Sequence, residues 1–162
     1  MNAFRALAET LTTLADAIRP LTPTEYTARD MKSSGSIGAH VRHCLDHVSA
    51  LERGLVSGEL CYDLRERNTI VEHDPRLGDS RLRRASARLG GYDDALLERP
   101  LVLTAQVSDR GTTVRVPTTV GRELAFVISH TIHHSALVAV LLEQRDREVP
   151  MSCYIISCVT GQ

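Results

Sequence analysis

Aromatic residues are scarce in this sequence: they make up 4% of its 162 residues, and tryptophan is absent. This scarcity argues against a protein that binds single-stranded nucleic acid, since such proteins stack bases on exposed aromatic rings. An excess of charge is also missing, because 19 basic residues stand against 20 acidic ones. No overall field therefore attracts the protein to phosphate backbones or anionic membranes. We expect neither nucleic acid nor a membrane as a partner.

Closely spaced cysteine pairs and an export signal are missing as well. The four cysteines contain no CxxC pair, and we interpret them as ordinary thiols in a reducing compartment. The N-terminal sequence MNAFRALAETLTTLADAI carries acidic residues and lacks the compact apolar core of a signal peptide. We therefore expect a cytoplasmic protein.

The length and the 43% hydrophobic content are typical of one globular domain, which we expect to cover residues 1–162. One apolar run, residues 124–142, has no formally charged residue and approaches the length of a membrane span. Its three histidines and the polar Ser129, Thr131 and Ser135 would make such a span costly. We interpret the run as a core helix.

Apolar residues recur at helical spacing in four segments of the chain. They predict helices over residues 2–18, 37–55, 79–97 and 118–144. Between the last two helices, the runs LVLTAQV and TTVRVP, joined by SDRG, predict a β-hairpin. Residues 57–80 lose the periodicity, and we interpret them as a long ordered connection. The expected fold is all-α, a four-helix bundle with long connections and a small β-hairpin insert between the third and fourth helices.

Six of the seven histidines lie in two of these helices. In SHTIHHSALVAVLL, His130 and His134 are four residues apart, which brings both imidazoles to the same face of a helix. The helix over 37–55 carries His40, His43 and His47 along one edge of its apolar stripe. Reactive zinc sites use three protein ligands and leave one position open. One histidine of the 37–55 helix, together with His130 and His134, would complete such a site.

Other interpretations of these histidines stay open. A buried histidine is often a hydrogen-bonded core residue, although burying several imidazoles without partners is costly and a metal supplies partners. His133 points about 100° away from the pair His130 and His134, so it would either support a ligand or only pack. His40 and His47 carry the same uncertainty on the other helix. We expect His73 at the surface.

The stretches SIGAHVRHCLDHV and HTIHHSALVAVLL resemble the motifs of the DinB-like family of metal-binding four-helix bundles, which includes the YfiT-type proteins. In that family the histidine that closes a motif like SIGxxxxH is a metal ligand, and here it is His43. The first and last histidines of a later HxxHH supply two more ligands, here His130 and His134. The resemblance implies a divalent metal, zinc or nickel, with water in the remaining positions. Cys44 follows His43 but turns toward the helix core, and we do not count it as a ligand.

The resemblance also implies a range of functions. Characterised members include transferases and isomerases that use low-molecular-weight thiols such as bacillithiol or mycothiol, and others are described only as damage-inducible. We expect a metal-dependent enzyme, a hydrolase or a thiol-dependent transferase, acting on a small-molecule thiol or an electrophile. The alternative is a non-catalytic, metal-stabilised bundle that serves as a binding or dimerisation module in the stress response. Bundles of this kind often pair through helix faces, so we expect a homodimer.

One further motif, YDLRER at residues 62–67, resembles a feature of one branch of the family. Arg65 and Arg67 would either recognise the carboxylates of a thiol cofactor or form surface ion pairs with Asp63 and Glu66. Beyond the three histidines, the sequence shows no evident general base.

Overall fold

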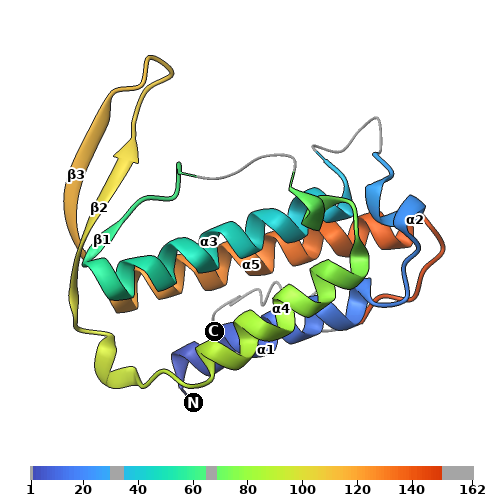
Figure 1. The fold of residues 1–162 in the computed structure, drawn as a ribbon, viewed down its shortest axis with the longest axis horizontal. Coiled ribbons are helices and arrows are strands. Elements are labelled where there is room, and N and C mark those ends of the chain that lie inside the picture. The colour runs from blue at the N-terminus through green and yellow to red at the C-terminus, as the bar shows by residue number, and fades with distance from the viewer. Residues whose placement is uncertain (1, 30–34, 65–68, 151–162) are drawn as a thin grey trace, which may run out of the picture.

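The computed structural model of the protein describes residues 2–29, 35–64 and 69–150, and this part of the chain is mostly helical. Its long helices are α1 (Ala3–Ile18), α3 (Ile37–Ser57), α4 (Pro75–Leu89) and α5 (Val120–Glu143) (Figure 1). The connections contain the short helix α2 (Pro23–Thr27) and two 3-10 helices, η1 (Ile70–Glu72) and η2 (Asp94–Leu96). The described part of the chain also contains three strands, which are β1 (Glu59–Leu60), β2 (Pro100–Gln106) and β3 (Thr113–Thr119).

The long helices pack in two close pairs that share one core. Helix α1 lies along α4, and α3 lies along α5, while further contacts join α1 to α5 and α3 to α4 (Figure 1). Each helix turns an apolar stripe toward this core, as its sequence spacing predicts. In α1 the stripe is fully buried and consists of Phe4, Leu7, Leu11, Leu14 and Ile18. The pairing of α3 with α5 matters most for function, because the two histidine-bearing helices lie side by side.

Side-chain caps set the ends of the helices. The side chains of Asn2, Ser36 and Thr119 accept hydrogen bonds from the first turns of α1, α3 and α5, respectively. Helix α3 ends at Gly58, whose φ of 79° is left-handed and favours glycine. These three helices therefore begin and end within about two residues of the predicted bounds.

The third long helix differs from its prediction. Helix α4 begins at Pro75 rather than at residue 79, because the Asp74 side chain accepts hydrogen bonds from the backbone N–H groups of Arg76 and Leu77. Proline in the first turn lacks an N–H that would have had no partner there. The helix stops at Leu89, and part of the predicted C-terminal half forms η2 instead. The connection predicted over residues 57–80 thus contains β1, η1 and the start of α4.

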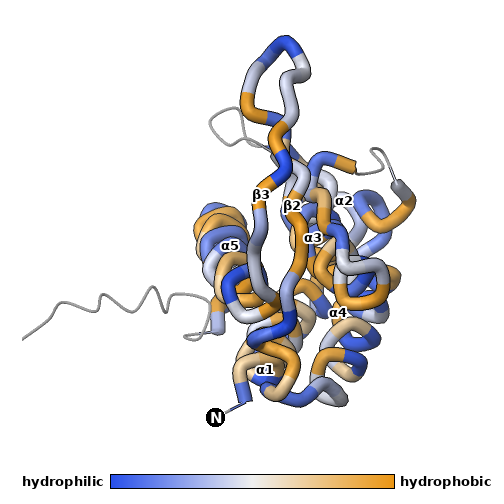
Figure 2. The backbone as a smooth tube through the Cα atoms, turned by 90° about the vertical axis from the view of Figure 1, so that its left-hand side faces the viewer, coloured by the Kyte–Doolittle hydropathy of each residue, from blue (hydrophilic) through white to orange (hydrophobic). Residues whose placement is uncertain are grey.

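The strands form a small mixed sheet at one end of the long helices, with the order β1-β2-β3. Strands β2 and β3 pair antiparallel, with Leu103 opposite Val116, and Gly111 in their turn has a φ of 82°. Their hairpin extends away from the helices (Figure 2). Strand β1 pairs parallel to β2, with Leu60 opposite Leu103, and it was not predicted. This parallel pairing attaches the connection after α3 to the sheet.

Within the described residues, α5 is long and apolar enough to cross a membrane by length and composition alone. Core helices pass the same test, and α5 packs against both α1 and α3. Its first turn also contains Glu123, a fully buried carboxylate bound by three donors.

Candidate metal centre

Histidines from α3 and α5 meet between the two helices. The Nε2 atoms of His43 and His130 are 2.8 Å apart. The ligand nitrogens of His43, His47 and His130 all lie within 4.8 Å of one another. The ring of His134 is centred 4.6 Å from the rings of both His43 and His130. Four imidazoles from two helices therefore gather at one place.

Hydrogen bonds orient two of these rings. Nδ1 of His47 lies 3.0 Å from the backbone oxygen of His43, one turn earlier in α3. A proton on Nδ1 donates to that carbonyl and leaves the lone pair on Nε2. Nδ1 of His134 lies 2.9 Å from Nδ1 of His40, and when His134 donates, its Nε2 likewise carries a lone pair. Metal-binding histidines are commonly held in this way by a hydrogen bond from the other ring nitrogen.

Burial favours the neutral imidazole at two histidines of the cluster, His134 and His40. Burial, followed by repulsion from His130 and His40, lowers the pKa of His134 to about 3. Burial, followed by the charge of His133, lowers the pKa of His40 as well. Neutral imidazole is the form that binds metal, and nitrogen donors suit zinc, nickel and related divalent ions. The nitrogen donor set, with His134 held neutral, therefore fits a divalent metal.

The three predicted ligands, His43, His130 and His134, lie close together in the structure. His43 and His130 face each other directly, and the ring of His134 adjoins both. His47, whose role the sequence left open, brings its ligand atom into the tightest group. His40 contacts His134 from outside that group.

The remaining candidates lie apart from this group. His133 is exposed, with its ring centred 5.3 Å from that of His134, and His73 is exposed as expected. Burial raises the pKa of the fully buried Cys44 to about 12, which disfavours the thiolate that a metal would need. Arg65 and Arg67 lie outside the described residues.

Two aromatic side chains flank the histidines. The ring of Tyr62 stacks on His47 with a centroid distance of 5.0 Å and an interplanar angle of 17°. The ring of Phe126 stacks on His130 at 5.5 Å and 20°, and it lies 5.1 Å from the ring of Tyr62. Together they form an apolar flank on the His47 and His130 side of the cluster.

A buried carboxylate holds this flank in position. Glu123 is fully buried, and it accepts hydrogen bonds from the hydroxyl of Tyr62 at 2.9 Å, from Thr118 at 2.7 Å and from Arg122 at 2.8 Å. The connection after β1 and the end of β3 are thereby tied to the first turn of α5. No sequence pattern predicts this contact, although Glu123 stands out as an acidic residue directly before the uncharged run of residues 124–142.

Removing the donor to this carboxylate is expected to destabilise the protein. The substitution Tyr62→Phe keeps the ring against His47 but leaves Glu123 with one hydrogen bond fewer, which should lower the free energy of unfolding by about 1.5–3 kcal/mol. The measurement is chemical denaturation. Tyr92→Phe is the matched control, because the Tyr92 hydroxyl makes no hydrogen bond within the described residues. Equal losses in both variants would contradict the assigned role.

The family model described as the DinB family matches residues 2–157, a range that includes every histidine of the cluster. No curated protein and no solved structure matches the chain. Because the family match covers nearly the whole sequence and both histidine motifs, the chain belongs to the DinB family.

Proposed function

We propose that this protein binds one divalent metal ion between α3 and α5 and acts as a metal-dependent enzyme. The observation that carries the proposal is the group of three histidine nitrogens within 4.8 Å of one another. His43 and His130 would be ligands. The third ligand would be His134, which the sequence motif favours, or His47, which the distances favour. Around this site we propose the family's four-helix bundle, with α1, α3, α4 and α5 as its helices and the β2–β3 hairpin inserted before α5.

The surroundings of the cluster support a reactive site. His43, His130 and His134 are only half-buried, and Phe126 is 36% exposed, so a small molecule can approach the histidines. Tyr62 and Phe126 exclude water from one side. A bound cation would lower the pKa of a thiol or a water molecule and supply a nucleophile at neutral pH. We therefore propose a thiol-dependent transfer or a hydrolysis, with a low-molecular-weight thiol or an electrophile as substrate.

The alternative is a metal-stabilised module without catalysis, acting through dimerisation. Metal analysis of protein purified without added metal should give about one divalent ion per chain under either proposal. Cobalt substitution then separates them, because a thiol that binds the metal produces a new sulfur-to-cobalt absorption band. The S-methylated form of the same thiol is the control and should produce none. A cobalt spectrum that no thiol changes would favour the non-catalytic module, and solution mass would test the proposed homodimer.

A further inference from the structure

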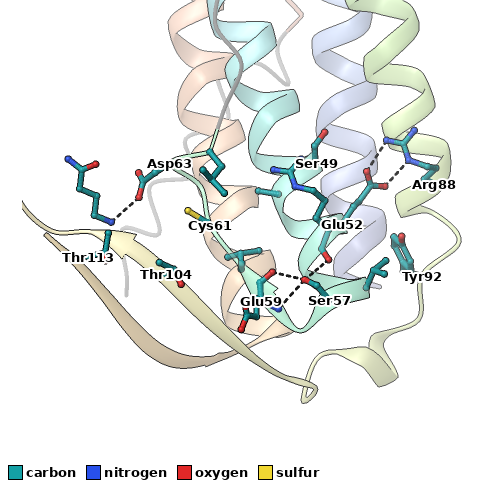
Figure 3. Close-up of a pocket in the computed structure, with 16 residues that line it drawn as sticks. Ser49, Glu52, Ser57, Glu59, Cys61, Asp63, Arg88, Tyr92, Thr104 and Thr113 are labelled. Carbon is teal, nitrogen blue, oxygen red and sulfur yellow. Dashed lines mark hydrogen bonds and ion pairs between the residues drawn. The ribbon is translucent and has the colours of Figure 1, made fainter. Parts of the chain in front are cut away.

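A groove runs along a flank of α3 that is separate from the histidine cluster. Its first part has a volume of about 1190 Å³ and lies between the C-terminal half of α3, the strands and the end of α4 (Figure 3). Its second part has a volume of about 830 Å³ and lies between α3, η1 and α4. The two parts share four lining residues, Ser49, Arg53, Leu64 and Arg88, so they form one continuous groove. None of the histidines lines either part.

The groove exposes apolar side chains. Among the described residues, the three most exposed large apolar side chains are Val56 at 86%, Leu64 at 74% and Ile70 at 69%, and all three line it. Exposed apolar side chains that gather in one concave place are typical of a binding site. Val56 and Leu64 both lie in the first part.

The three carboxylates that line the first part of the groove each have a partner in the protein. Glu52 forms a two-pronged ion pair with Arg88, at 2.8 and 2.9 Å (Figure 3). Glu59 pairs with Arg115, and the Asp63 carboxylate accepts a hydrogen bond from the backbone of Gln106. This part therefore presents apolar surface beside carboxylates that already have partners, and Arg53 is its one lining arginine that forms no ion pair within the described residues.

The second part carries an excess of positive charge. Its lining contains five arginines and one carboxylate, that of Asp46. Arg42 pairs with Asp46 and Glu72, and Arg88 pairs with Glu52. Within the described residues the other three, Arg53, Arg81 and Arg84, form no ion pair.

We propose that this groove binds a small amphipathic anion. The acidic head group would pair with Arg53, Arg81 and Arg84, and the apolar body would lie along Leu64 and Val56. Charge complementarity selects this occupant, because guanidinium groups pair with carboxylates and phosphates in two-pronged contacts. A nucleic acid fits poorly, since one half of the groove is apolar and the chain as a whole carries a net charge of -1. This proposal does not depend on the metal site.

Binding is tested by calorimetry with two amphipathic anions, octyl phosphate and octanoate. Octanol is the control for the apolar body alone, and inorganic phosphate is the control for the head group alone. We expect at least one of the octyl anions to bind at least tenfold more tightly than either part alone. The tighter anion identifies the head group as a phosphate or a carboxylate. Octanol binding as tightly as both anions, or no binding of either anion, would overturn the proposal.

Variants locate the two ends of the ligand. The double substitution Arg81→Glu and Arg84→Glu should weaken anion binding at least tenfold and leave octanol binding unchanged. Arg5→Glu with Arg110→Glu, two exposed arginines outside the groove, is the control of equal charge and should change affinity less than twofold. An equal loss in both double variants would overturn the assignment.

The apolar end is tested in the same assay. Val56→Ser should weaken binding of all octyl ligands at least threefold, whereas Val107→Ser, at a residue 58% exposed and outside the groove, should not. Sedimentation of the protein alone tests for self-association, and pelleting with anionic vesicles tests for membrane binding. A groove that is buried by self-association, or that binds anionic vesicles but neither octyl anion, would contradict a small-molecule site.

Discussion

The His130→Ala variant, purified without added metal, is expected to contain almost no divalent metal. His130 belongs to both proposed ligand sets, and its Nε2 lies 2.8 Å from that of His43, so alanine removes a donor from the centre of the cluster. The loss should also lower the melting temperature. A metal present at 100 times its dissociation constant adds about 2.7 kcal/mol, which corresponds to roughly 5–10 °C for a chain of this size. Metal analysis and a thermal melt of the same sample measure both effects.

Two further variants decide the third ligand. His47→Ala should remove as much metal as His130→Ala if the distances identify the set, and His134→Ala should do so if the sequence motif does. Whichever of these two histidines is not a ligand, its alanine variant should still contain metal but bind it less tightly. His133→Ala and His73→Ala are the controls, because both residues are exposed, and they should retain full metal content. Stoichiometric metal in His130→Ala would refute the proposed centre.

The sequence predicted those features that depend on local spacing. Helices α1, α3 and α5 have long apolar stripes and side-chain caps, and the mostly helical fold follows from them. Helix α4 was misplaced because Asp74 and Pro75 look like part of a loop, although together they start a helix. Strand β1 has two residues, too few to show a period, and exists only through its pairing with β2.

The candidate site could be predicted only in part, for a similar reason. Spacing shows that His130 and His134 share a face of one helix, and the family motif adds His43. Which histidine of α3 comes nearest depends on how α3 is rotated against α5, and packing over the whole core sets that rotation. The contact between Tyr62 and Glu123 joins residues that are 61 positions apart, so no local pattern contains it.

The SIG motif at the start of α3 has a physical explanation, and a substitution in it is expected to cause a large loss of stability. Ser36 caps the helix, Ile37 is fully buried, and Gly38 lies where a side chain has no room. A Cβ atom at Gly38 would be 2.2 Å from the backbone oxygen of Glu72 and 2.7 Å from the ring of Tyr26. The motif therefore serves close packing of η1 and α2 against α3, in addition to any role of its histidine.

Gly38→Ala is expected to lower the free energy of unfolding by about 1–3 kcal/mol. Gly38 lies in the first turn of α3, and the clash of an added Cβ there involves backbone, which has no alternative rotamer. Relief would require η1 to move, and the hydroxyl of the buried Tyr26 donates to Val71 there at 3.0 Å. Chemical denaturation measures the loss.

The control for this prediction is Gly90→Ala at the end of α4. Gly90 has right-handed helical backbone angles, and the atom nearest to an added Cβ would be 3.6 Å away, so alanine should be neutral or stabilise by about 0.4–1 kcal/mol. If Gly38→Ala proved as stable as Gly90→Ala, η1 would not be pressed against α3. The contrast between the two glycines therefore tests the close packing of η1 and α2 against the first turn of α3.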